Sequence, residues 1–297
     1  MNRIIGVLLA PFLFLCLSCQ SNGKKPNNLP RPEVAKNDKV YIVPHYLKEI
    51  SGICFVADSV VAAIEDERGI LYFYDLTKED TIKTYQFAEE GDYEDVAIVN
   101  NTLYVVNSTG HILEVGNFRD NPLPTKTYNT PLKSKNNIEG LAYDKDNNRL
   151  LVAVKDEGLY DNINKDIYAF NLETKQLDTA AVYSIKLKEI EEFYKGDKLE
   201  ESSKEFLKAF GNHKLNKVFR TSALAVNPTT KEIYVLSSLN NMIAILSPET
   251  GKIIRIIELH GPEYSQPEGL AFASDGRLYV SNESSGKIAN IIRIVYE

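Results

Sequence analysis

The sequence of 297 residues predicts an all-β fold, a β-propeller, on three observations. A short apolar strand opening with a Glu/Ser-Gly-Leu type of triplet recurs along the chain. Each copy continues through a polar turn into a second apolar strand and a polar cluster, with no helical periodicity. Most copies start about 45 residues apart, which is the length of a propeller blade. The copies begin at Ser51, Glu94, Glu139, Ser222 and Glu268.

The first 36 residues predict export and lipid attachment. Arg3 and the apolar run from Ile4 to Leu17 have the order of a secretory signal peptide, and the run is shorter than the ~20 residues of a membrane span. It ends at Ser18-Cys19, and lipoprotein processing requires a small residue before the lipidated cysteine. We expect a signal peptide over residues 1–18, lipid on Cys19 and a flexible tether over residues 19–36. A plain cleaved signal peptide or an uncleaved anchor is the alternative.

The location follows from the same segment. No acidic run follows Cys19, which favours an outer-membrane lipoprotein of the cell envelope that faces the periplasm. Apart from Cys19, the chain beyond the signal peptide contains only Cys54, so no disulfide framework is possible and a hydrophobic core must stabilise the fold. Cys54 lies in an apolar run and is expected to be a small buried residue.

The strands of the predicted domain, residues 37–297, are bounded by turn residues. In the first blade, Asp58-Ser59 and Arg68-Gly69 mark hairpin turns between apolar runs. The last copy supplies only three strands before the sequence given ends, and one spare strand, Lys39–Val43, precedes the first copy. Pairing this strand with the final blade would close the ring and remove an open sheet edge.

One wide gap decides between five and six blades. The third and fourth copies start about 83 residues apart, nearly two periods. Within residues 183–217, apolar side chains recur at three-to-four spacing among Lys and Glu, which indicates short amphipathic helices and not strands. We therefore expect five blades with a helical insertion over residues 183–217, and six blades as the alternative.

The first residue of each copy is expected to line one mouth of the central channel, because the inner strand of every blade starts at the same face. Glu94, Glu139 and Glu268 would then converge, and their mutual repulsion calls for a cation or a bound ligand. Oxygen ligands without paired Cys or clustered His favour Ca²⁺ or Mg²⁺ over zinc. The sequence thus predicts a Ca²⁺ or Mg²⁺ site at this mouth.

More polar side chains follow the second strand of each blade. The residues predicted to complete a metal site are Asp66, Glu67, Asn282 and Glu283. The residues predicted to bind a ligand are Ser51, Asp92, Asn107, Asp156, Glu157 and Ser237. The alternative for both sets is a structural role, capping loop amides or lying solvated at the rim.

Six motifs resemble one known family when they are taken together and in order. They are Glu49-Ile50-Ser51-Gly52-Ile53, Glu65-Asp66-Glu67-Arg68-Gly69, Gly91-Asp92-Tyr93-Glu94, Asn137-Ile138-Glu139-Gly140-Leu141, residues 233–238 and residues 266–272. The chain resembles the SdiA-regulated (YjiK-like) family of bacterial β-propeller lipoproteins, itself distantly similar to NHL-repeat propellers. The resemblance covers nearly the whole mature domain and implies five blades, a calcium site and no established activity. The chain departs from the family at residues 220–223, where Pro-Ser-Gly is usual, and this puts the contribution of the fourth blade to a channel site in doubt.

Three functions remain open at this point. The leading hypothesis is a non-catalytic, calcium-binding module, anchored to a membrane by its lipid, that binds a protein or a small molecule as a monomer. The alternative is a Ca²⁺-dependent hydrolase of the lactonase, phosphoesterase or phytase type. A third is a structural partner in an envelope complex, with an exposed apolar patch. The net charge of −7 disfavours nucleic acid as a partner.

Overall fold

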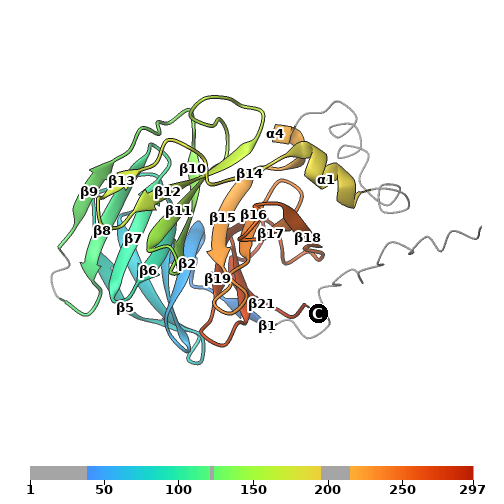
Figure 1. Ribbon diagram of the computed structural model, residues 1–297. Helices are drawn as coiled ribbons and strands as arrows, with labels where there is room; N and C mark the ends of the chain where they lie inside the picture. Colours follow the sequence, from blue (N-terminus) through green and yellow to red (C-terminus); the bar gives the residue numbers. More distant parts are fainter. Residues whose placement is uncertain (1–38, 121–123, 195–214, 297) are drawn as a thin grey trace, which may run out of the picture. The chain divides into compact units, whose positions relative to one another are not determined.

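The computed structural model describes residues 39–120, 124–194 and 215–296 (Figure 1). All these residues lie in one compact unit that spans residues 31–297. Its strands form five antiparallel sheets, each ordered from an inner strand outward. Each inner strand contacts the inner strand of the next blade, and the last, β19, contacts the first, β2. The ring is therefore closed, and the prediction of a five-bladed propeller is confirmed, so the six-bladed alternative is wrong.

The first two blades are regular four-stranded meanders. Blade one contains β2 (Ile50–Ala57), β3 (Val60–Glu65), β4 (Ile70–Asp75) and β5 (Asp80–Gln86). Blade two contains β6 (Tyr93–Val99), β7 (Thr102–Asn107), β8 (His111–Asn117) and β9 (Lys126–Asn129). In both blades the second strand is almost wholly buried, while the outermost strand is mostly exposed. The outer edge of each blade therefore faces solvent.

Blades three and four flank the predicted insertion. Blade three contains β10 (Ile138–Asp144), β11 (Arg149–Val154) and β12 (Lys165–Asn171), and two short strands, β13 (Gln176–Leu177) and β14 (Tyr183–Ile185), pair with different parts of β12. Blade four contains β15 (Thr221–Val226), β16 (Ile233–Ser237), β17 (Met242–Leu246) and β18 (Ile253–Glu258). The asymmetry of the ring is therefore concentrated between these two blades.

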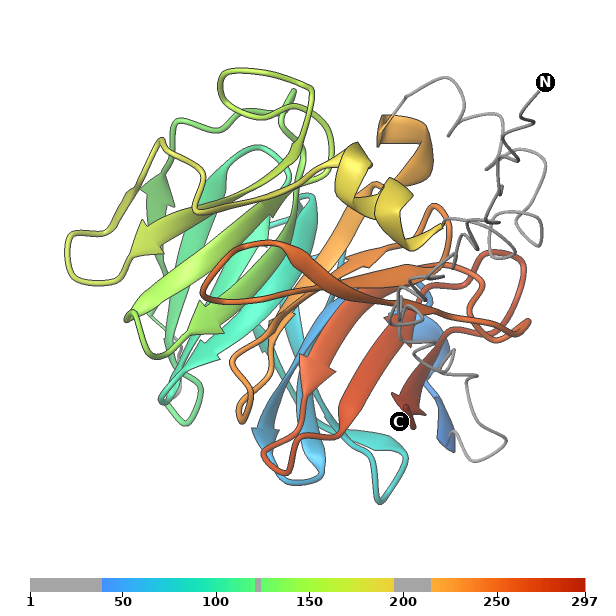
Figure 2. The ribbon, with the colours of Figure 1, turned by 45° about the vertical axis from the view of Figure 1, so that its right-hand side comes forward.

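The insertion expected over residues 183–217 is only partly helical in the described residues. Its first residues form strand β14, and the helices α1 (Leu187–Phe193) and α4 (Leu215–Val218) follow; residues 195–214 lie outside the described structure. Ile190 of α1 and Val218 of α4 are buried in the core between blades three and four, beside which both helices lie (Figure 2). A short 3-10 helix, η1 (His45–Leu47), precedes blade one. No helix among the described residues is long and apolar enough to cross a membrane.

The fifth blade closes the ring with both ends of the described chain. It contains β19 (Pro267–Phe272), β20 (Leu278–Asn282) and β21 (Asn290–Ile294), and β1 (Lys39–Ile42) pairs antiparallel with β21. The predicted closure by the spare N-terminal strand is confirmed. The Tyr74 hydroxyl of blade one donates a hydrogen bond of 3.0 Å to the Ile42 carbonyl, so β1 also ties the fifth blade to the first.

The hydrophobic core lies between adjacent blades as five separate clusters. Cys54 belongs to the cluster between blades one and two and is a free, buried thiol. Turns expected from the sequence have the required backbone, because Asn148 and Gly276 adopt positive φ angles of 48° and 86° at two inner hairpins. Each inner strand thus starts and ends at a defined level of the channel.

Candidate functional site

A β-bulge interrupts every inner strand near its start. In β6, for example, the register shifts between Tyr93 and Asp95, and Glu94 lies at the bulge. A bulge leaves a residue outside the pairing ladder and redirects its side chain. The bulge residues of the five blades are Ser51, Glu94, Glu139, Ser222 and Glu268. We call these five residues the channel ring.

The three glutamates of the channel ring do come together, and a lysine lies among them. The Lys155 ammonium nitrogen lies 3.0 Å from Glu139 Oε1, and Glu94 and Glu268 also act electrostatically on Lys155. Lys155 directly follows β11, where the other blades place Asp66, Ser108, Ser238 and Glu283. The sequence prediction passed over this lysine in favour of Asp156 and Glu157. Aligning the residues that directly follow the second strand of each blade would have identified Lys155.

Burial and charge set the protonation of the channel ring. Desolvation and the neighbouring Glu139 raise the pKa of Glu94 far above its usual range, while Lys155 opposes the shift. Desolvation also raises the pKa of Glu139, and Glu94 and Glu139 share a hydrogen bond. The two carboxyl groups therefore titrate as a coupled pair, and burial favours a proton shared between them. Burial raises the pKa of Glu268 to about 7, although Lys155 lowers it.

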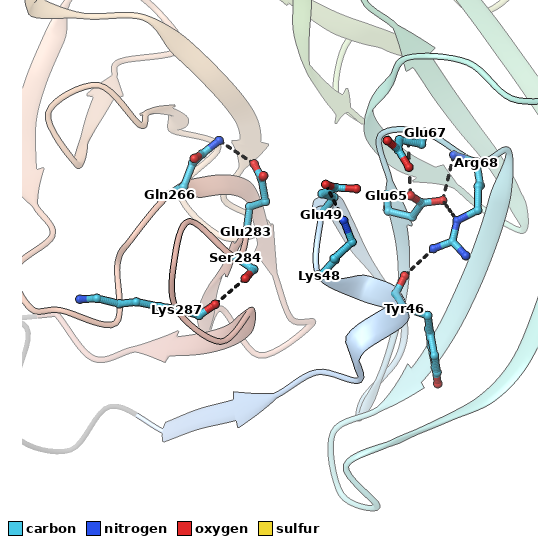
Figure 3. A network of polar contacts seen from close by, with 10 residues as sticks. All are labelled: Tyr46, Lys48, Glu49, Glu65, Glu67, Arg68, Gln266, Glu283, Ser284 and Lys287. Atoms are coloured by element: carbon cyan, nitrogen blue, oxygen red, sulfur yellow. Dashed lines mark hydrogen bonds and ion pairs between the residues drawn. The ribbon is translucent and has the colours of Figure 1, made fainter.

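A second acidic group lies on the side of blades one and five, where Figure 3 shows Glu49, Glu67 and Glu283. Burial raises the pKa of Asp66 to about 6, and the carboxylates of Glu49, Glu283, Glu65 and Glu67 add to the shift. One buried oxygen of Asp66, Oδ1, has no hydrogen-bond partner among the described residues. We call Asp66, Glu67, Glu283 and Glu49 the acidic group.

Only part of the acidic group is neutralised by protein cations. Carboxylate oxygens of Glu49, Glu65 and Glu67 lie within 4.8 Å of one another. Glu65 is paired with Arg68, whose Nε lies 2.7 Å from Glu65 Oε1, and Glu49 is paired with the exposed Lys48 at 2.8 Å. Among the described residues, no ion pair is made by Asp66, Glu67 or Glu283. Gln266 donates to Glu283 Oε2 at 2.6 Å, and this bond leaves the negative charge uncompensated.

Several predicted ligand residues have structural partners instead. Asp92 accepts a short hydrogen bond from Ser108, and Asn107 holds its own turn by accepting from the backbone N–H of His111 at 2.9 Å. Asp156 pairs with Arg220 at 2.6 Å.

The remaining predicted residues are scattered. Ser237 accepts from the backbone N–H of Arg220, and Glu157 is partly exposed, with Lys135 at 3.8 Å. Asn282 is fully buried, and its Oδ1 has no partner among the described residues. Ser51 is buried in the channel ring, and its carbonyl accepts from Ser281 at 2.7 Å.

Asp95, which the sequence prediction did not single out, lies across the channel next to the ring. Its carboxylate accepts hydrogen bonds from the backbone N–H groups of Val96 at 2.8 Å and Leu141 at 2.7 Å, and Leu224 of blade four also donates to it. A Cβ atom on Gly52 of blade one would lie 2.4 Å from Asp95 Oδ1. One carboxylate therefore touches four blades and separates the two ends of the channel.

The triplet repeated at the start of each inner strand contained the information that would have identified Asp95. Its middle residue is small in the other four blades, namely Gly52, Gly140, Ala223 and Gly269. These small residues leave room at the axis for one larger side chain. Burial raises the pKa of Asp95 well above its usual range, while the backbone donors oppose the shift.

Comparison with known proteins supports this architecture. The profile of the family described as SdiA-regulated matches residues 39–286, and no curated protein matches the chain. Among solved structures, a glutaminyl cyclase from Myxococcus xanthus is 13% identical over 86% of this chain and 95% of its own, with a TM-score of 0.54. A streptogramin B lyase is 14% identical over 86% of this chain and 68% of its own, with a TM-score of 0.45. Of these two structures only the cyclase bears on the fold, and at 13% identity it bears on the fold alone.

Proposed function

The chain belongs to the SdiA-regulated family, and we propose that it is a lipoprotein of the cell envelope whose propeller binds Ca²⁺ at the acidic end of its channel. Lipid on Cys19 would hold it in the outer membrane, facing the periplasm. The bound cation would complete a surface that binds a protein or a small molecule. In this proposal the module has no catalytic role.

The observation that carries the cation site is the state of Asp66. Its carboxylate has four acidic neighbours and a pKa raised to about 6, and its buried Oδ1 lacks a partner among the described residues. A buried acceptor without a donor is costly, and a hard divalent cation offers both the missing contact and the missing charge. The donors at hand are all oxygens, which fits Ca²⁺.

The ligand set that we propose is narrower than the set expected from the sequence. Glu139 already has the Lys155 ammonium against it, and Glu94 shares a hydrogen bond with Glu139, so these two have partners within the protein. Asp66, Glu67, Glu268, Asn282 and Glu283 remain, with Glu49 beside them. When bound, the cation would neutralise this group. The bulge in β19 would position Glu268 around the cation. The end of β3 would position Asp66 and Glu67, and the end of β20 would position Glu283.

Calorimetric titration with Ca²⁺ tests this proposal on the chelator-stripped segment 31–297, which contains every described strand and the ring closure. We expect one ion per chain for the wild type, and loss of binding in Asp66→Asn and Glu283→Gln. Glu139→Gln is the matched control inside the ring and should still bind. Wild type that takes up no Ca²⁺, or Asp66→Asn that binds as wild type does, would overturn the site.

The anchor has its own test. Full-length protein made in a bacterial host with labelled palmitate should carry the label and sediment with the outer membrane. Cys19→Ser should carry none and appear in the soluble periplasmic fraction. An unlabelled wild-type protein would contradict the lipoprotein proposal and leave the cation site untouched.

One observation favours the hydrolase alternative. The pKa of Glu268, about 7, suits a general acid or base at neutral pH. Turnover of a lactone or a phosphoester by the Ca²⁺-loaded segment, lost in Glu268→Gln, would establish an enzyme. Absence of turnover across both substrate classes supports the binding module.

A further inference from the structure

We propose that the channel holds a second site, at the end opposite the channel ring, for a compact apolar molecule with one anionic end. The site is a cavity of about 540 Å³ that is lined by residues from all five inner strands. It starts at the level of Ile53, Val96 and Leu141, directly beyond Asp95, and opens among the inner hairpin turns at Asp58 and Asn100. Asp95 lies between it and the acidic end.

The repeat itself builds the walls of this cavity. Two residues after Ile53, Val96, Leu141 and their equivalents in the other two blades, each inner strand has a large apolar side chain that is only partly buried. These five residues are Phe55, Ile98, Tyr143, Val226 and Phe272. Each lies at the edge of a different core cluster, so the five core clusters all reach the cavity. We call these residues the apolar ring.

A ring of small residues leaves the space that the apolar ring surrounds. Between the two apolar levels, each blade has Cys or Ala, namely Cys54, Ala97, Ala142, Ala225 and Ala271. Larger side chains at these five positions would fill the channel. Partly exposed aromatic and aliphatic side chains around an empty space gain free energy when an apolar ligand covers them.

The size of the cavity selects a small molecule. Pockets for small ligands have volumes of about 300–1,000 Å³, and this one lies within that range. It lies inside the ring of blades and is lined by residues from all five inner strands, so it suits a compact molecule better than an extended chain segment. A medium-chain acyl group or a fused aromatic ring system fills such a volume.

The charged residues at the rim of the cavity favour a ligand with an anionic end. Asp144 is paired with Arg149 at 2.8 Å, and Asp146 is paired with Lys231 at 3.4 Å. Asp58 accepts from the Ser274 hydroxyl at 3.2 Å. Lys145 lines the same cavity and is exposed, and its side chain has no ion-pair or hydrogen-bond partner among the described residues. A carboxylate or sulfonate at the rim would meet this ammonium, whereas an amine would meet Asp58, whose carboxylate already accepts a hydrogen bond.

Fluorescence titration of the segment 31–297 with 1-anilinonaphthalene-8-sulfonate, an apolar dye with one sulfonate, tests the site. We expect saturation at one dye per folded chain and displacement by decanoate at lower concentration than by decylamine. No saturable binding, or displacement by decylamine as effective as by decanoate, would overturn the proposal.

Variants distinguish binding inside the cavity from nonspecific binding to the protein surface. Ile98→Trp, at a partly exposed position, should fill the cavity and abolish binding while the cooperative thermal transition is kept. Lys145→Gln should weaken decanoate about fivefold, the effect of one exposed ion pair of ~1 kcal/mol, and leave decanol unchanged. Lys126→Gln, an exposed lysine on β9 far from the cavity lining, is the matched control and should bind decanoate as wild type does.

A second variant that fills the cavity is needed in case the first variant does not fold. If Ile98→Trp does not fold, Val226→Phe on another wall is used, and retained dye binding in a folded filling variant would overturn the site. Asp66→Asn should bind the dye normally, because the acidic group lies beyond Asp95. Loss of Ca²⁺ binding and loss of dye binding are therefore independent results.

Discussion

The ammonium nitrogen of Lys155 lies 3.0 Å from a carboxylate oxygen of Glu139, with the two side chains only 19% and 5% exposed. A protein cation therefore stands where three converging glutamates call for a counter-charge. The pair divides the acidic end of the channel into a neutralised half near blades two and three and an uncompensated half near blades one and five. The cation site proposed above lies in the second half.

Lys155→Met should lower the free energy of unfolding by about 3 kcal/mol at pH 8, because it leaves buried carboxylates without their cation. The loss should shrink at pH 5, where Glu268 is protonated and repels less. Urea unfolding at both pH values measures this. Lys126→Met, an exposed lysine, should change stability by less than about 0.5 kcal/mol, and an equal loss in both variants would contradict the role of Lys155.

Stability of the metal-free protein should fall as pH rises from about 4.5 to 7, the interval between the ordinary and the folded-state pKa of Glu268. In this interval the unfolded chain releases the Glu268 proton while the folded chain keeps it, so folding becomes less favourable. Asp66, with a pKa of about 6, acts in the same direction from its ordinary value of 3.8. Asp75, with a pKa lowered to about 2, acts oppositely, at lower pH.

Glu268→Gln tests that assignment. The variant should flatten the fall in stability between pH 4.5 and 7 by about 3 kcal/mol, since the pKa rises from 4.5 to about 7 and one pKa unit corresponds to about 1.4 kcal/mol. Urea midpoints measured across the range in the presence of chelator give the comparison. A Glu268→Gln profile parallel to wild type would show that another group titrates there.

Asp95→Ala should be among the most destabilising single changes, at about 3 kcal/mol. It removes the acceptor of three buried backbone N–H groups, and unsatisfied buried donors are costly. Asp275→Ala is the control, because its carboxylate accepts from the N–H of Arg277 at an exposed turn and should cost less than about 1 kcal/mol. Chemical denaturation of both variants decides; a mild Asp95→Ala would mean that water replaces the carboxylate.

The closing strand β1 should be essential to the fifth blade. Tyr41 is 5% exposed and packs against Tyr279 with ring centroids 6.4 Å apart, so Tyr41→Ala should cost about 3 kcal/mol. Val40, its neighbour on the opposite face, is 41% exposed, and Val40→Ala should cost less than about 0.5 kcal/mol. A segment that starts at residue 44 should lose cooperative unfolding. Equal effects at the two positions would argue against the closure.

The repeat, read from the sequence alone, determined the fold of this protein. The triplets at Ser51, Glu94, Glu139, Ser222 and Glu268 mark inner strands because their apolar and polar pattern is local, and a local pattern needs no three-dimensional information. The spare strand before the first blade and the missing fourth strand of the last blade together predicted the closure. The acidic character of one channel mouth followed from the same alignment.

Only the tertiary structure decided how these residues act on one another. Lys155 and Glu139 come from adjacent strands of one blade, but their pairing depends on the bulge that redirects Glu139. Asp95 finds two of its three donors in blades three and four, more than 40 residues away along the chain. The cavity depends on five side chains that meet only when the ring closes. Distances across the axis set the electrostatics and the empty volume, and no local pattern in the sequence encodes those distances.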